Sequence, residues 1–115
     1  MYPPDQFDEV RPLCEGLAVC SEAGLPYVRF AKLQLPDGCS PDKVDALFCP
    51  TPRDGYSSRL YFAQAISTPV ARNWNGNLRL LDTTWHAFSW ALTPPPNARL
   101  AQLLAMHLAG MRRAA

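Results

Sequence analysis

The sequence predicts an α+β domain built from an N-terminal helix, an antiparallel meander of three to four strands, and a C-terminal helix packed on the sheet. Two patterns support this fold class. Apolar residues recur every three or four positions near both ends of the chain, whereas the middle holds short apolar runs separated by proline and glycine. At 115 residues the whole chain, 1–115, fits one domain, which buries roughly two-thirds of the surface its unfolded form exposes.

The first predicted element is an amphipathic helix over residues 7–20. Its apolar stripe consists of Phe7, Val10, Leu13, Cys14, Leu17 and Cys20. Pro12 is tolerated in the first turn of a helix, so the regular helix begins there, after a looser lead-in turn. Gly24 and Pro26 then end the element.

Three apolar segments follow and predict the strands of the meander. They lie at 27–35, 44–49 and 59–66, and turn residues separate them. Short connections of this kind favour antiparallel neighbours. Asn75-Gly76 predicts a tight turn, and residues 78–81 are either a short fourth strand or an extended stretch packed on the sheet.

The final predicted element is a helix that follows three consecutive prolines. Asn97 is a suitable N-cap, because its side chain can accept a hydrogen bond from the first turn. The inward apolar face comprises Leu100, Leu103, Leu104, Met106 or His107, Leu108 and Met111. The sheet must bury one face against this helix and the first one.

Charge and composition exclude several classes of protein. Lys and Arg number 11 and Asp and Glu number 10, and the net charge of +1 gives no footprint for nucleic acid. No apolar run approaches the roughly 20 residues that span a bilayer, and the N-terminus lacks the pattern of a secretory signal. We therefore expect a cytoplasmic protein that binds neither nucleic acid nor membrane.

The four cysteines show no metal-binding pattern. There is no Cys-x-x-Cys pair and no histidine at ligand spacing, so we expect neither a metal site nor a cofactor. Cys14, Cys20 and Cys49 fall in apolar patterns and are expected in the core as reduced thiols. Cys39 lies in a turn and is expected to be an exposed thiol without a catalytic role.

An ordered series of segments carries a resemblance to a known family. A proline-rich turn at 50–56 precedes the strand at 60–66, an Asn-Gly segment at 75–82, Trp85 and a helix at 99–112. This series resembles the ubiquitin-conjugating enzyme fold, above all its divergent prokaryotic families. The resemblance implies a component of a bacterial pathway that attaches a ubiquitin-like protein. Its implied partners are a ubiquitin-activating-enzyme-like protein and that ubiquitin-like protein.

The chain departs from this family at the positions that carry its chemistry. The family places a His-Pro-Asn step after the third strand and a catalytic cysteine after Asn-Gly. Here Thr68-Pro69-Val70 stands at the first place and Arg79 near the second, so the usual nucleophile and oxyanion donor are missing. The family resemblance also implies that the first helix, with Phe7, Val10 and Arg11, and the adjoining sheet edge dock the activating enzyme.

Hydroxyl groups offer a replacement nucleophile. The candidates lie within eight consecutive residues: Asp82, Thr83, Thr84, His86 and Ser89. They could supply a hydroxyl, a base and an orienting carboxylate for an oxyester-forming acyl transfer. The alternative is structural, because Asp82, Thr83 and Thr84 are also typical of a turn or helix cap.

Aromatic residues concentrate in the same part of the chain. Trp85 is expected to anchor the core, whereas Trp74, between two asparagines, is expected to be an exposed binding anchor together with Arg79. Three functions therefore remain open. They are acyl transfer through a hydroxyl, a non-catalytic scaffold in the same pathway, and an unrelated small-ligand-binding or structural subunit.

Overall fold

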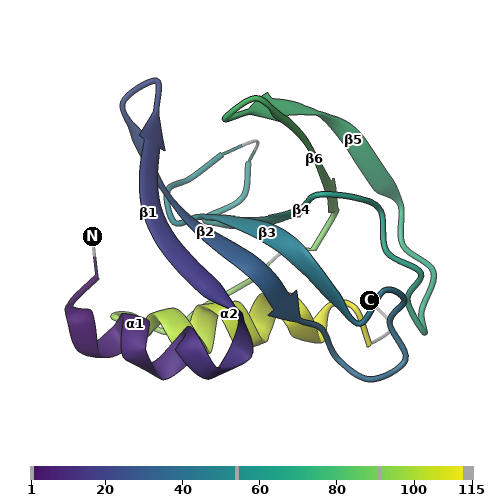
Figure 1. Ribbon diagram of the computed structural model, residues 1–115, viewed down its shortest axis with the longest axis horizontal. Coiled ribbons are helices and arrows are strands. Elements are labelled where there is room, and N and C mark those ends of the chain that lie inside the picture. Colours follow the sequence, from purple (N-terminus) through teal and green to yellow (C-terminus); the bar gives the residue numbers. More distant parts are fainter. Residues whose placement is uncertain (1, 54, 91, 113–115) are drawn as a thin grey trace.

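The computed structural model, which describes residues 2–53, 55–90 and 92–112, is organised around one six-stranded antiparallel sheet (Figure 1). The strands are β1 (Gly16–Glu22), β2 (Leu25–Gln34), β3 (Lys43–Cys49), β4 (Arg59–Phe62), β5 (Trp74–Leu80) and β6 (Thr83–Phe88). Their order across the sheet is β1-β2-β3-β4-β6-β5. The helical elements are α1 (Pro4–Val10), the short 3₁₀ helix η1 (Arg11–Leu13) and α2 (Leu100–Ala109). None of the helices among these residues is long and apolar enough to cross a membrane.

The prediction of a three- to four-stranded, ubiquitin-conjugating-enzyme-like meander is wrong, since the sheet has six strands and dominates the fold. One additional strand, β1, comes from the second half of the predicted first helix. The helix ends at Val10, and the 3₁₀ turn containing Pro12 leads directly into an extended chain. Leu17 and Val19 alternate with Ala18 and Cys20 in this strand, so Leu17 and Cys20 of the predicted helical stripe lie on opposite faces of the sheet.

The second additional strand, β6, pairs with β5, and a tight turn joins the two strands. The sequence predicts a tight turn at a different position. Leu81 and Asp82 form this turn, with φ values of 51° and 60°. The predicted turn at Asn75-Gly76 instead lies inside β5, beside a register shift. A Cβ atom at position 76 would lie 2.5 Å from the ring of His86, so Gly76 lets this ring pack on the strand without displacement.

The two helices lie side by side beneath one face of the sheet and hold each other in place (Figure 1). The sequence predicts that Asn97 caps α2, but this prediction is wrong. Asn97 has a φ of 58° and precedes the start of the helix by three positions. The side chain of Gln6 in α1 supplies the cap, since its Oε1 accepts the backbone N–H of Leu100 at 2.9 Å. Arg99 adds ion pairs to Asp5 and Glu9 at 2.7 and 2.9 Å.

Apolar side chains cover both faces of the sheet. The helix-side core lies between the sheet and the helices and contains Val28, Phe30, Phe48, Phe62, Leu100 and Leu104. The hairpin-side core lies on the opposite face and contains Tyr27, Leu47, Cys49, Tyr61, Leu80, Trp85 and Ala87. The β1–β2 and β5–β6 hairpins rise on that side (Figure 1), where the Glu22 carboxylate accepts the Leu81 N–H at 3.3 Å. The sheet is therefore curved around a second core.

Candidate functional site

The β5–β6 hairpin carries the residues that the sequence proposes as a catalytic cluster, but it divides them between two faces. Trp85 and Ala87 of β6 point into the hairpin-side core, and Thr83 shares their face. Thr84 and His86 lie on the other face. Ser89 is exposed beyond the end of the strand, and Asp82 is exposed in the turn. The structure therefore brings Thr84 and His86 to one face and leaves the remaining candidates apart from them.

The threonine hydroxyls are engaged in local hydrogen bonds of the turn. Thr83 Oγ1 donates to the carbonyl oxygen of Leu81 at 3.4 Å. Thr84 Oγ1 accepts from Nη1 of Arg79 at 3.3 Å, and Nη2 of the same guanidinium donates to the carbonyl oxygen of Asp82 at 3.1 Å. Arg79 of β5 thus contacts its cross-strand neighbour Thr84 and the turn between the two strands. These contacts match the structural interpretation of the sequence cluster.

His86 lacks the contacts of a general base for these hydroxyls. Its imidazole packs over Gly76 on the neighbouring strand. Within residues 2–53, 55–90 and 92–112, no hydrogen bond joins His86 to Thr83, Thr84 or Ser89. A hydroxyl needs a base within hydrogen-bond reach to become an effective nucleophile, and this arrangement does not supply one.

The cysteines provide no activated thiol. Cys39 was expected on the surface, but it is only 8% exposed and belongs to the helix-side core. Burial raises the pKa of Cys14, Cys20 and Cys39 above the usual thiol range, although Arg112 partly opposes the effect at Cys39. Cys49 is fully buried, as its apolar strand predicts. A raised pKa lowers the fraction of nucleophilic thiolate.

The residues of the first helix that the family resemblance assigns to docking differ in accessibility. Val10 is fully buried in the helix-side core and offers no surface to a partner. Phe7 is half-buried, and the Tyr2 ring stands edge-on to it at a centroid distance of 6.1 Å. Arg11 is exposed and donates to the carboxylate of Asp8 at 3.1 Å. Only Arg11 and part of Phe7 remain accessible.

Trp74 is also less exposed than the sequence predicts. Its ring stands edge-on to Phe62 at 5.8 Å and to Phe88 at 5.1 Å, so it belongs to an aromatic cluster at the border of the helix-side core. One part of the indole is accessible, as its intermediate burial shows. Arg79, the second predicted binding residue of this hairpin, is exposed.

The strand β1 forms one edge of the sheet. Seven residues, Gly16–Glu22, pair with β2 in continuous register, and no other strand among the described residues pairs with the opposite side. The strand contains no lysine, arginine or proline, and Val19 is 54% exposed. The other edge, β5, is interrupted by a register shift between Asn75 and Leu78. Of the two edge strands in the described part of the chain, β1 therefore presents the more regular template for strand pairing.

One buried polar pair was not predicted from the sequence. Ser58 Oγ and His107 Nε2 lie 2.8 Å apart, although 49 positions separate them, and both residues are buried. The Phe48 ring stands edge-on to the imidazole at 5.8 Å. A cavity of only about 10 Å³ lies beside His107, which is too small for a substrate. The pair therefore connects α2 to the β3–β4 loop and does not form an open site.

The described residues contain no group of three or more histidine, cysteine, aspartate or glutamate side chains placed to hold a metal ion. No family model, curated protein or solved structure matches this chain. Function is therefore inferred from the geometry of the β1 edge and the β5–β6 hairpin, together with the resemblance carried by the sequence.

Proposed function

We propose that this chain is a cytoplasmic, non-catalytic protein-binding module that pairs a strand of its partner with β1. The observation that carries the proposal is the regular edge of β1, which from Gly16 to Ser21 carries no charged residue and no proline. Natural proteins usually protect such edges with lysine, proline, a bulge or a covering segment, because exposed N–H and C=O groups pair with other chains. Peptide recognition by strand addition uses these same groups for affinity.

The β5–β6 hairpin supports the non-catalytic part of the proposal. The hydroxyls of Thr83 and Thr84 are held in turn contacts, and His86 is packed over Gly76 rather than hydrogen-bonded to either of them. The family's cysteine position near Arg79 carries a guanidinium that binds the turn. This hairpin is therefore better suited to a structural role than to acyl transfer.

The identity of the partners follows from the sequence resemblance and not from the fold. Segments 50–56 and 75–82 resemble those of the prokaryotic ubiquitin-conjugating families, which implies a ubiquitin-like protein and its activating enzyme as partners. The resemblance assigns docking to the first helix and the adjoining sheet edge. In this chain α1 and η1 lead directly into β1, so the accessible edge lies next to the implied helix.

Val19→Lys is expected to weaken partner binding at least tenfold, about 1.4 kcal/mol, because lysine on an edge strand opposes pairing with another strand. The partners to test are the activating enzyme and the ubiquitin-like protein encoded nearest to this gene, by isothermal titration calorimetry. Val19→Thr retains strand propensity without charge and should bind as the wild type does. Unchanged binding of the lysine variant, with its fold intact by circular dichroism, would contradict pairing at β1.

Incubation with ATP and these two proteins should give no covalent adduct by intact mass spectrometry. The expected result reflects the absence of a base beside the hydroxyls of the hairpin. An adduct that resists reducing agent, is cleaved by mild base and disappears in Thr84→Val would instead assign acyl transfer to this chain. Thr84→Ser is the matched control, because it keeps the hydroxyl and should keep any such adduct.

A further inference from the structure

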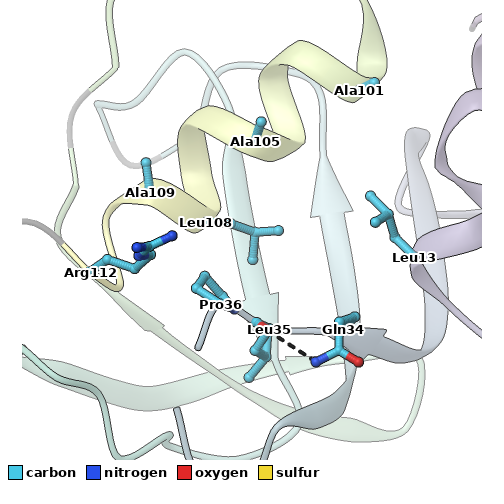
Figure 2. A pocket seen from close by; sticks show the side chains of 9 residues that line it. All are labelled: Leu13, Gln34, Leu35, Pro36, Ala101, Ala105, Leu108, Ala109 and Arg112. Carbon is cyan, nitrogen blue, oxygen red and sulfur yellow. Dashed lines mark hydrogen bonds between the residues drawn. The ribbon is translucent and has the colours of Figure 1, made fainter. Parts of the chain in front are cut away.

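A second surface, separate from the free edge of β1, is an apolar groove beside α2. The groove has a volume of about 580 Å³ and lies between α2, the end of β2 and η1 (Figure 2). Its apolar lining includes Leu13, Leu35, Ala101, Ala105, Leu108 and Ala109. This volume lies within the range of sites that hold a small organic ligand or a short peptide segment.

The shape of the groove favours close approach of a chain to the helix. Ala101, Ala105 and Ala109 follow one another at every turn of α2, and Figure 2 shows them along the helix while Leu108 extends toward Leu35. Leu13 is 38% exposed at the groove and is one of two large apolar side chains that the described residues leave so accessible. An apolar occupant would cover this side chain.

The groove is also lined by one charged hydrogen-bond donor, Arg112, and by one side chain with a free acceptor, Gln34. Arg112 is exposed beyond the end of α2, and none of the carboxylates described in the structure forms an ion pair with it. The Gln34 amide nitrogen donates to the carbonyl oxygens of Leu35 and Asp42 at 3.2 and 3.1 Å. Both of its N–H groups are thus used, which leaves the Gln34 side-chain oxygen as a positioned acceptor.

We propose that this groove binds the carboxyl-terminal segment of a partner protein. The apolar side chains of the segment lie against the alanines of α2 and Leu13, its terminal carboxylate pairs with Arg112, and a backbone N–H donates to Gln34. The groove accommodates only a short segment, and Arg112, which pairs with none of the described carboxylates, supplies the charge that a chain terminus requires. This inference goes beyond strand pairing at β1 and does not depend on it.

A fatty acid is the closest competing occupant. It matches the apolar lining and the charge of Arg112, but it has no N–H group for the oxygen of Gln34. A peptide satisfies both polar groups and the apolar surface together. The chemistry of the groove therefore favours a peptide.

Fluorescence polarisation with labelled short peptides tests the proposal. The probe is a mixture of peptides with apolar residues at the last four positions and a free carboxyl terminus, and the same mixture with an amidated terminus is the comparison. The free carboxylate should bind about two- to fivefold more tightly, as expected for an exposed ion pair. Arg112→Gln should remove this difference, whereas Lys32→Gln, which removes an exposed cation outside the groove, should preserve it.

A second variant tests the apolar part of the groove. Ala105→Phe fills the space beside α2 and should abolish binding of both peptide mixtures, while Gln102→Phe adds the same ring at an exposed position outside the groove and should not. Absence of saturable binding to the wild type would overturn the proposal. So would equal binding by Ala105→Phe, or binding of dodecanoate without binding of the peptides. Loss of strand pairing in Val19→Lys leaves these results unchanged, which separates the two surfaces.

Discussion

Trp85→Ala should lower the free energy of unfolding by about 3–5 kcal/mol, the range found when a large buried aromatic side chain is removed. Trp85 is fully buried at the centre of the hairpin-side core. Its indole Nε1 donates to the carbonyl oxygen of Leu80 at 3.0 Å, and the guanidinium of Arg29 lies 5.5 Å from the ring centroid. The substitution removes the apolar contacts and leaves the buried Leu80 carbonyl without this donor.

Urea unfolding followed by circular dichroism measures this effect. Trp74→Ala is the matched control, because its indole is only partly buried at the border of the other core and should cost less. Trp85→Phe should fall between the wild type and Trp85→Ala, since it keeps a ring but loses the hydrogen bond. A loss below about 1 kcal/mol for Trp85→Ala would show that the hairpin-side core is not tightly packed.

Sequence patterns identified the elements whose residues fit one interpretation only. The strand predicted at 44–49 is confirmed as β3, and the segment at 27–35 is confirmed as β2 with a shift at its start. Trp85 is buried, as expected. In these segments, apolar runs too short for a helix are bounded by turn residues, so the helical and extended periods do not compete.

The first strand was missed because its residues fit two periods. Leu17 and Cys20 continue the helical spacing of α1, while Leu17 and Val19 also alternate as a strand requires. Pairing with β2 decides between these patterns, because it joins seven residues in continuous register and satisfies the backbone groups on that side of the strand. Such a contact depends on a neighbour in space, which local periodicity does not contain.

The residue types of the candidate site were predictable from the sequence, but their arrangement in the β5–β6 hairpin was not. The cluster from Asp82 to Ser89 was found from residue types, but alternation along β6 separates Thr83 from Thr84 and His86. Gly76 indicated a turn in the sequence, whereas its role is to admit the ring of His86. Residue types therefore located the hairpin, and only the pairing of its strands excluded the catalytic geometry.

The buried Ser58–His107 pair should make the stability of the protein depend on pH. Burial, with a further contribution from the Arg59 cation, lowers the pKa of His107 from 6.5 to about 4 in the folded protein. The unfolded chain therefore binds a proton at higher pH than the folded chain does. The contribution of His107 to the free energy of unfolding is fully present above about pH 6.5 and is lost as the pH decreases toward 4. This loss reaches about 3 kcal/mol.

Urea unfolding of the wild type and His107→Gln across this pH range isolates the contribution of His107. Glutamine keeps a hydrogen-bonding side chain near Ser58 but does not titrate, so the variant should lack the additional loss between about pH 6.5 and 4. The difference between the two curves removes the effect of the carboxylates, which titrate in both proteins. Parallel curves for the wild type and His107→Gln would mean that His107 takes up its proton without disturbing the contact between α2 and the β3–β4 loop.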